Sequence, residues 1–422
     1  MDGGESARRK KRRSRMRIIT GGVTAAKGFE AAGVEAGIKY KDRKDMAMIY
    51  SKAPCVTAGT FTSNAVKAAP VLWDQKVVEK SPFGQAVIVN AGIANAGTGK
   101  EGYSYCERTA AAAARELKIP ENSVLVASTG VIGMQLPIDR IEAGISKLAR
   151  AKADTPEAGD LAAAAIMTTD THAKQAAVQI EVGGATVTLG GMCKGSGMIH
   201  PNMCTMLGFL TTDAVISKEL LAKALREDVA DTFNMVSVDG DTSTNDTLLI
   251  LANGMAENPE ILEGTREYAV FQEALHYVNE TLAKMMAGDG EGATALFEVK
   301  VIGAAAKQEA RTLARSVVSS SLCKSAVYGH DANWGRFLCA LGYSGVNFDP
   351  ENMELYFESA AGKLLVYKDG AGAAYSEEKA SEILSQPQVT VIADMKAGTH
   401  SATAWGCDLP YDYVKINADY RS

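Results

Sequence analysis

The chain has 422 residues, of which 46% are hydrophobic and 22% charged, and its formal net charge is −6. This composition is typical of a globular protein with a large core, either two or three domains or one large α/β unit. No apolar run reaches the length of a membrane span, so we expect no contact with a membrane. The seven cysteines and five histidines are scattered without the spacing of a disulfide framework or a metal site, which favours a cytoplasmic location and no bound metal.

The first sixteen residues differ from the rest because seven lysines and arginines crowd into Arg8–Arg15 beside two acidic residues. Without this arm the 44 basic residues fall to 37 and the 50 acidic residues to 48, a net charge of −11. We expect no nucleic-acid binding by so acidic a body. The arm lacks the apolar middle of a signal peptide, and we interpret residues 1–16 as a disordered basic extension.

From residue 17 to about residue 194, short apolar runs that predict strands alternate with segments whose apolar residues are spaced as in a helix. A first strand is expected at Arg17–Gly22, and a small loop at Pro156–Gly159. Further strands are predicted at Met46–Tyr50, Ala86–Val89, Val124–Ala127, Ala177–Val182 and Ala185–Leu189, the last two joined by a Gly183-Gly184 turn. Helices are predicted at Tyr103–Leu117, Ile138–Lys152 and Asp160–Met167.

The second half continues the alternation. Strands are predicted at Met206–Thr211, Leu296–Val301, Glu354–Phe357, Lys363–Tyr367 and Val389–Asp394. Helices are predicted after the capping residue Ser217, at Glu267–Met286 and near Gln308–Ser320. This order predicts an α/β (α+β) fold of mixed sheets layered with helices. With neither a repeat nor a low-complexity linker, the halves on either side of Thr205 are expected to interlock.

Three glycine-rich or acidic segments imitate known motifs. Gly97–Gly102 fits the dinucleotide pattern G-x-G-x-x-G but does not directly follow a strand, and Gly288–Ala293 follows a helix. Asp239–Asp246 resembles a calcium loop until Thr244 takes the place of the required glycine. We interpret Gly97–Gly102 as a turn that leads from a loop into a helix and Asp239–Asp246 as a turn with backbone caps, and we reject the dinucleotide motif at Gly288–Ala293.

The segment from Lys194 to Asp213 carries the most chemical information. Its glycine-broken turn leads to Thr205 at the start of an apolar strand. A threonine hydroxyl needs a base to act as a nucleophile, and cutting the chain just before the threonine supplies its own α-amine. Polar segments also end other elements, at Ser128–Gly130, Thr168–Thr171, Gly290–Gly292 and Lys415–Ser422. Each of these by itself is typical of a structural turn.

Taken together, these segments resemble one family, the ornithine acetyltransferases of arginine biosynthesis (glutamate N-acetyltransferases, the ArgJ family). The resemblance extends from Ile18 to Ser422. The motifs that carry it are Gly28–Gly33, Gly37–Lys39, Phe61–Asn64, Ala69–Val71, Asn90–Gly92, Ala94–Ala96, Ala127–Gly133, Met167–Thr171, Lys194–Asp213, Gly288–Thr294, Asn333–Arg336 and the C-terminal tail.

The resemblance implies an ArgJ/DmpA-like self-cleaving N-terminal-nucleophile fold. It implies cleavage between Cys204 and Thr205, giving an α chain of residues 17–204 behind the arm and a β chain of residues 205–422. Cys204 stands where the family usually has alanine, and its effect on the cleavage rate is left open. Two α and two β chains are implied to form a heterotetramer.

The resemblance also implies the chemistry. Thr205 accepts acetyl from N-acetylornithine and passes it to glutamate, while Thr129 and Gly130 form the oxyanion hole. No cofactor is implied, and the use of acetyl-CoA as a second donor is left open. The implied substrate-binding residues are Thr168, Lys194, Thr205, Glu291, Asn417 and Ser422.

Two other functions remain open on the residues alone. A self-cut threonine or serine nucleophile also suits an aminopeptidase or amidohydrolase, which would release free acetate instead of passing acetyl to glutamate. A binding or assembly protein would use the glycine loops only as turns and would stay uncut.

Overall fold

The computed structural model describes residues 16–200 and 206–419. These residues form two compact units. Unit 1 comprises the described residues up to 194, those of 202–229 and residues 243–282, and unit 2 comprises the described residues of 195–201, residues 230–242 and those from 283 onward. Residues 1–15 of the basic arm, Cys204, Thr205 and Ser422 lie outside the described residues, whereas Met16, which was expected to end the disordered extension, begins the first strand.

Unit 1 is built on a mixed sheet of nine of the described strands, in the order β1-β6-β7-β8-β10-β3-β4-β5, with β2 paired to β3. The bounds are β1 Met16–Ile19, β2 Phe29–Val34, β3 Met46–Phe61, β4 Gly84–Ile93, β5 Val124–Val131, β6 Lys174–Val182, β7 Ala185–Lys194, β8 Leu207–Thr212 and β10 Thr247–Ala252. Strands β4, β8 and β10 are buried along their whole length, as expected for strands in the middle of a covered sheet.

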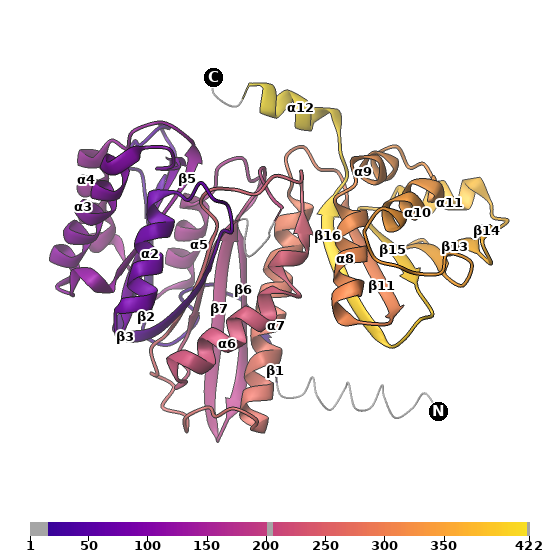
Figure 1. The fold of residues 1–422 in the computed structure, drawn as a ribbon. Coiled ribbons are helices and arrows are strands. Elements are labelled where there is room, and N and C mark those ends of the chain that lie inside the picture. The colour runs from indigo at the N-terminus through magenta and orange to yellow at the C-terminus, as the bar shows by residue number, and fades with distance from the viewer. Residues whose placement is uncertain (1–15, 201–205, 420–422) are drawn as a thin grey trace. The chain divides into compact units, whose positions relative to one another are not determined.

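Helices pack against this sheet and close its core. They are α2 Ala69–Lys80, α3 Gly99–Leu117, α4 Ile138–Ala151, α5 Pro156–Ala165 and α6 Lys218–Val229, with α7 Arg266–Gly288 beginning in unit 1 and ending in unit 2. Figure 1 shows α2, α3 and α4 grouped together, and the structure places α5 against β2 and α6 against β3. Consecutive apolar residues of β3–β5 meet the alanine-rich faces of α3 and α5 in one core cluster.

The chain segments before and after position 205 share the sheet of unit 1. Strand β7 pairs antiparallel with β8, β8 pairs parallel with β10, and β10 pairs antiparallel with β3. The expected interlocking of the two halves is therefore confirmed.

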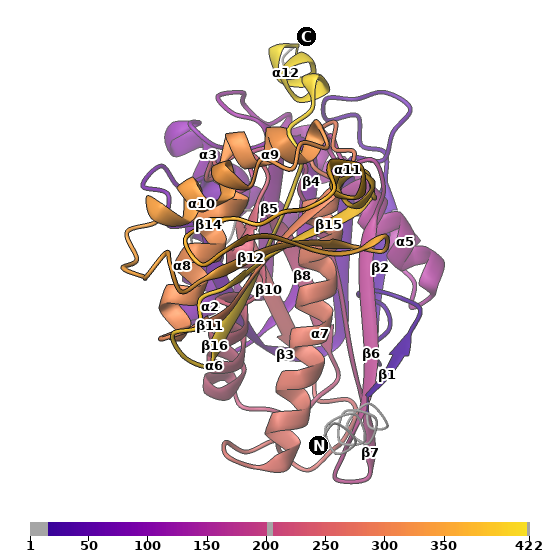
Figure 2. The same ribbon diagram turned by 90° about the vertical axis from the view of Figure 1, so that its right-hand side faces the viewer.

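Unit 2 contains a second mixed sheet, of seven of the described strands, in the order β14-β13-β12-β15-β11-β16-β9. The strands are β9 Val236–Ser237, β11 Leu296–Ala304, β12 Glu354–Ser359, β13 Gly362–Lys368, β14 Ala371–Gly372, β15 Gln388–Asp394 and β16 His400–Cys407. The helices are α8 Lys307–Val318, α9 Ser321–Tyr328, α10 Trp334–Gly342, α11 Glu377–Leu384 and α12 Tyr411–Ala418. Helix α8 packs along β11 and β16, and α11 packs on β12 and β13 (Figure 2).

Most predicted elements are present, and the predicted class, mixed sheets layered with helices, is confirmed. The Gly183-Gly184 turn has φ values of +58° and +89°, which suits a tight hairpin between β6 and β7. The Ser217 hydroxyl accepts a hydrogen bond from the Leu220 N–H at 3.2 Å, as a helix cap does. No helix in the part of the chain that the structure describes is long and apolar enough to cross a membrane.

One prediction about local structure is wrong. Pro156–Gly159 was expected to be a loop, but it forms the first turn of α5, which ends at Ala165 and not at Met167. Thr155 caps this helix by accepting a hydrogen bond from the Ala158 N–H at 3.3 Å. Pro156 fits the first helical position because its missing N–H would have had no partner there.

Gly33 allows α5 to approach β2 closely, and this contact generates a stability prediction. A Cβ at Gly33 would lie 2.1 Å from the Leu161 carbonyl oxygen, which belongs to the backbone of α5. Gly33→Ala should lower the free energy of unfolding by about 2–3 kcal/mol, measured by chemical denaturation. Gly342→Ala is the control, because a Cβ there meets no atom within 4 Å. A loss for Gly33→Ala no larger than for this control would contradict the prediction.

Candidate active site

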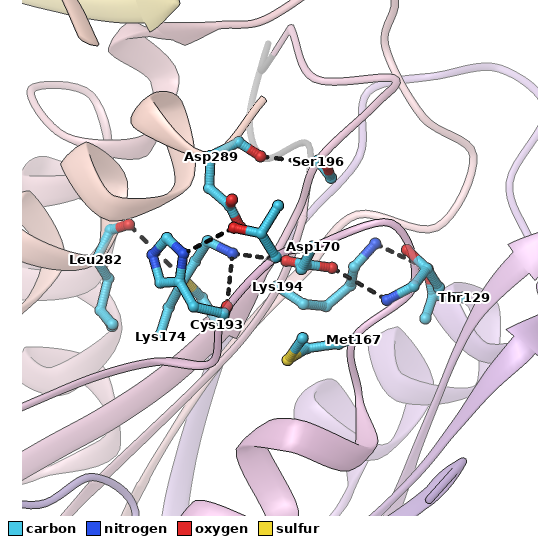
Figure 3. A network of polar contacts seen from close by, with 12 residues as sticks. Thr129, Met167, Asp170, Lys174, Cys193, Lys194, Ser196, Leu282 and Asp289 are labelled. Carbon is cyan, nitrogen blue, oxygen red and sulfur yellow. Dashed lines mark hydrogen bonds and ion pairs between the residues drawn. The ribbon is translucent and has the colours of Figure 1, made fainter. Parts of the chain in front are cut away.

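Lys194 lies at the end of β7 and is only 7% exposed. Its Nζ lies 3.3 Å from the hydroxyl oxygen of Thr129, and Figure 3 shows the two side chains pointing toward each other. In the β7–β8 ladder Lys194 pairs with Leu207, two residues after position 205. A buried cation therefore stands beside the start of β8.

Thr129 and Gly130 occupy a bulge where β5 runs beside β4. Ile93 pairs with both Thr129 and Val131, which marks the irregularity in register. Gly130 has a φ of +130°, and a Cβ there would lie 2.1 Å from the Gly92 carbonyl carbon. Only glycine fits this position, and bulges of this kind often re-aim groups at active sites.

Buried asparagine side chains hold the backbone around the bulge in place. The Asn245 Nδ2 donates to the carbonyl oxygens of Ala94, at 2.6 Å, and Ser128, at 2.8 Å. The Ser128 hydroxyl in turn donates to the Asn90 Oδ1 at 2.6 Å. These bonds satisfy buried carbonyl groups around Thr129 and hold its backbone in place.

A buried carboxylate lies between two lysines near Thr168. Asp170 accepts hydrogen bonds from the Lys174 Nζ at 2.8 Å and from the Thr168 N–H at 3.0 Å, and the side chains of Asp170 and Lys174 are fully buried (Figure 3). Burial alone would raise the pKa of Asp170, but the Lys194 and Lys174 ammonium groups outweigh it and lower the pKa to about 2. The carboxylate therefore stays charged and balances both lysines.

Thr168 is held in its loop by a second contact. The Arg43 guanidinium donates to the carbonyl oxygens of Met167, at 2.6 Å, and Thr168, at 3.0 Å. Thr168 is half-buried, and its backbone is fixed at both its N–H and its C=O.

Asp246 precedes β10, and the next residue, Thr247, donates its N–H to the Met206 carbonyl at 2.8 Å. Asp246 is 1% exposed, and its Oδ2 has no hydrogen-bond partner among the residues described. Burial raises the pKa of Asp246 well above its ordinary value, although Ser243, Thr62, the Lys194 ammonium and the Met206 N–H oppose the shift. A buried carboxyl group with a raised pKa therefore lies beside the start of β8.

In unit 2, Glu291 is the central polar residue of the loop after α7. It is 4% exposed and accepts a hydrogen bond from the Asn417 Nδ2 of α12 at 2.6 Å. Its N–H donates to the Ser196 carbonyl at 3.3 Å, and the Ser196 hydroxyl donates to the Asp289 carbonyl at 3.1 Å (Figure 3). A Cβ at Gly197 would lie 2.4 Å from a Glu291 carboxylate oxygen, so the glycine makes room for this carboxylate.

The structure thus forms two groups of the residues expected at the site. Thr129, Gly130, Thr168 and Lys194 belong to unit 1, and Glu291 and Asn417 belong to unit 2. Thr205, Cys204 and Ser422 lie outside the described residues. Within residues 16–200 and 206–419 no group of three or more His, Cys, Asp or Glu side chains is arranged to hold a metal ion.

Four further residues of the first group were not singled out from the sequence. They are Arg43, Asp170, Asn245 and Asp246. Their signal was weak because polar residues of this kind are common in turns. The polar triplet Thr168-Thr169-Asp170 at the end of a helix was the clearest hint.

The Asp170 pair gives a pH-dependent prediction. Because Asp170→Asn removes a buried carboxylate that lies beside two buried ammonium groups, it should cost about 3–5 kcal/mol of unfolding free energy at pH 7. The folded pKa lies below the unfolded value of about 3.9, so the carboxylate stabilises above pH ~4 and this contribution is lost as the pH falls toward 2. Urea denaturation at pH 7 and pH ~3 should show the difference shrinking at the lower pH.

The control for this measurement is the exposed Glu157→Gln in α5, which should change stability by less than about 0.5 kcal/mol at either pH. A difference between wild type and Asp170→Asn that does not change with pH would contradict the charge argument.

Comparison with known proteins identifies relatives over almost the whole chain. The model of the ArgJ family matches residues 30–422. The proteins named arginine biosynthesis bifunctional protein ArgJ from Thermotoga neapolitana and Symbiobacterium thermophilum are 50% and 53% identical, over 94% and 96% of this chain and 99% and 100% of their own. A crystal structure of a protein with that name from Bacillus halodurans is 44% identical over 50% of this chain and 97% of its own, with a TM-score of 0.48. The chain therefore belongs to the ArgJ family and is an acetyltransferase of arginine biosynthesis.

Proposed function

We propose that the protein transfers acetyl from N-acetylornithine to glutamate through an acetyl ester on Thr205, after cutting itself between Cys204 and Thr205. The observation that carries this proposal is the buried Lys194 ammonium beside the Thr129 hydroxyl, in a strand whose end pairs with Leu207. A hydroxyl next to a glycine-built bulge can stabilise a developing oxyanion, and the neighbouring ammonium can attract a substrate carboxylate. Family membership supports the same reaction.

The cut proceeds in two balanced steps. The Thr205 Oγ attacks the Cys204 carbonyl carbon, the C–N bond breaks, and the released nitrogen takes the hydroxyl proton to become the new α-amine. Water then hydrolyses the resulting ester, giving the Cys204 carboxylate and the free Thr205 hydroxyl. A free α-amine has a pKa near ~7.7–8.0, so a substantial fraction is neutral at neutral pH and serves as the base.

The transfer follows the same logic. The Thr205 Oγ attacks the acetyl carbonyl carbon of N-acetylornithine, its proton passes to the α-amine and then to the departing amino group, and ornithine leaves. The amino group of glutamate then attacks the acetyl ester and restores the hydroxyl. In this scheme Thr129 and the Gly130 N–H face the oxyanion, and either Lys194 or the pair Asn417 and Ser422 attracts a substrate carboxylate. Thr168 and Ser422 complete the binding residues.

Glu291 suits the cationic side chain of ornithine. Its carboxylate is buried and accepts a hydrogen bond from the Asn417 amide. A substrate ammonium could therefore pair with a carboxylate from which solvent is largely excluded. Acetyl-CoA as a second donor and an assembly of two α and two β chains belong to this proposal as expectations from the family.

Intact-mass spectrometry of the purified protein tests the cut. Wild type should give two fragments that meet between Cys204 and Thr205, because the hydroxyl is the attacking group. Thr205→Ala should give one uncut chain, and the matched variant Thr205→Ser, which keeps a hydroxyl, should still be cut. With N-acetylornithine the fragment that begins at residue 205 should gain one acetyl group transiently. Two fragments from Thr205→Ala would refute the mechanism.

Steady-state kinetics test the role of Glu291. Glu291→Gln keeps an oxygen for the Asn417 amide but removes the charge, so kcat/KM for N-acetylornithine should fall by about tenfold or more. The same constant for glutamate, which lacks a cationic side chain, should fall much less. Glu351→Gln, at an exposed site of unit 2, is the matched control and should change neither constant. Equal losses for both substrates would remove Glu291 from this role.

A further inference from the structure

The segment Gly195–His200 lies just upstream of the bond that the proposed function cuts, and it is bound to the turn that follows β9. Asp239 accepts hydrogen bonds from the backbone N–H groups of Met198, at 2.6 Å, and Ile199, at 2.9 Å. The Val238 N–H donates to the Ile199 carbonyl at 2.7 Å, and the Thr242 hydroxyl donates to the His200 carbonyl at 2.9 Å. All of these groups belong to unit 2.

Met198 needs this support because its backbone has a φ of +58°. Residues other than glycine seldom adopt this left-handed conformation. Its side chain is 42% exposed, so packing does not explain the conformation. The N–H groups of Met198 and Ile199 both donate to the Asp239 carboxylate. Hydrogen bonds to a charged acceptor are stronger than those between neutral groups. Asp239 is therefore the group that stabilises the turn.

Beyond this turn the chain is held at His200. The His200 Nδ1 lies 3.0 Å from the Ser237 hydroxyl, and its Nε2 lies 3.1 Å from the Arg315 guanidinium. Burial and the Arg315 charge lower the pKa of His200 to about 4, so the ring is neutral at neutral pH. The direction in which the chain leaves toward position 201 is thus set by contacts on both sides of Ile199.

Asp239 also reaches the helix that carries Asn417. The Tyr413 hydroxyl of α12 donates to the Asp239 Oδ2 at 3.3 Å, and the Tyr413 carbonyl accepts from the Asn417 Nδ2 at 3.0 Å. The same amide donates to Glu291. One carboxylate is therefore linked both to the segment before the proposed cut and to the helix that positions a proposed substrate contact.

We propose that Asp239 is a positioning residue for self-cleavage, which holds the left-handed turn at Met198–Ile199 so that the chain enters the Cys204–Thr205 bond in the reactive direction. This inference rests on the proposed cut. Asp239 follows the cut in the sequence and Met198 precedes it, so after cleavage the same two hydrogen bonds join the two chains and retain the new C-terminal segment on unit 2. The turn at Asp239–Asp246 is thereby given a role beyond a connection between strands.

The test is a time course of cleavage, followed by intact-mass spectrometry from the end of synthesis in a cell-free translation reaction. Asp239→Asn loses the charge and at least one of the two strong acceptor bonds, and it should cleave about tenfold more slowly than wild type. Asp241→Asn is the matched control, because Asp241 is exposed and contacts Asp239 only through its own N–H. It should cleave at the wild-type rate.

Two substitutions at Met198 separate positioning from a general loss of structure. Met198→Val disfavours the left-handed turn without touching Asp239 and should slow cleavage in the same direction. Met198→Gly adopts that turn without a steric cost, and in the Asp239→Asn background it should restore part of the lost rate. The Met198 pair decides the question even where Asp239→Asn fails to fold.

The outcomes distinguish this inference from the proposed function. Cleavage of Asp239→Asn and Met198→Val at the wild-type rate, beside normally cut wild type, would overturn the role of Asp239 alone. So would slow cleavage of Asp239→Asn that Met198→Gly does not improve, together with unchanged Met198→Val. A wild-type chain that is never cut would instead overturn the proposed function.

Discussion

The pairing of β7 with β8 and of β8 with β10 is the constraint on which the rest of unit 1 depends. These ladders bring together chain segments from before and after position 205, and they bury all three strands in the middle of one sheet. Backbone hydrogen bonds of this kind do not require a continuous chain, so the sheet can hold both sides of an interrupted polypeptide. The same ladders place Lys194 and Asp246 beside the start of β8.

Burial of charge is the second feature that organises the site. Lys194 and Lys174 lie in the interior beside Asp170, whose pKa they lower, whereas burial raises the pKa of Asp246. Two carboxyl groups in one unit therefore have pKa values shifted in opposite directions by their surroundings. Divergent pKa values of this kind are typical of sites where protons move.

The sequence predicted most of the fold because hydrophobic periodicity and turn residues were strong, as at the Gly183-Gly184 hairpin and the helix after Ser217. It failed at Pro156–Gly159, where a capping threonine before a proline outweighed the loop composition. Within the site, Thr129 and Lys194 were named from resemblance, and their contact joins β5 and β7, which are not neighbours in the sheet, so no local pattern records it. The parts played by Arg43 and Asn245 were hidden because they bind backbone carbonyls of distant segments, which no local pattern records.

The order of strands in unit 1 also sets an order of events during biosynthesis. Strand β3 is synthesised early, but one of its neighbours in the sheet, β10, is synthesised long after it. Contacts between such distant segments form slowly, because a long loop must close before the pairing is gained. The self-cleavage that we propose, whose groups are assembled by that sheet, would have to wait for it. Cleavage would then occur only in chains that have formed this sheet, and a misfolded polypeptide would remain a single uncut chain.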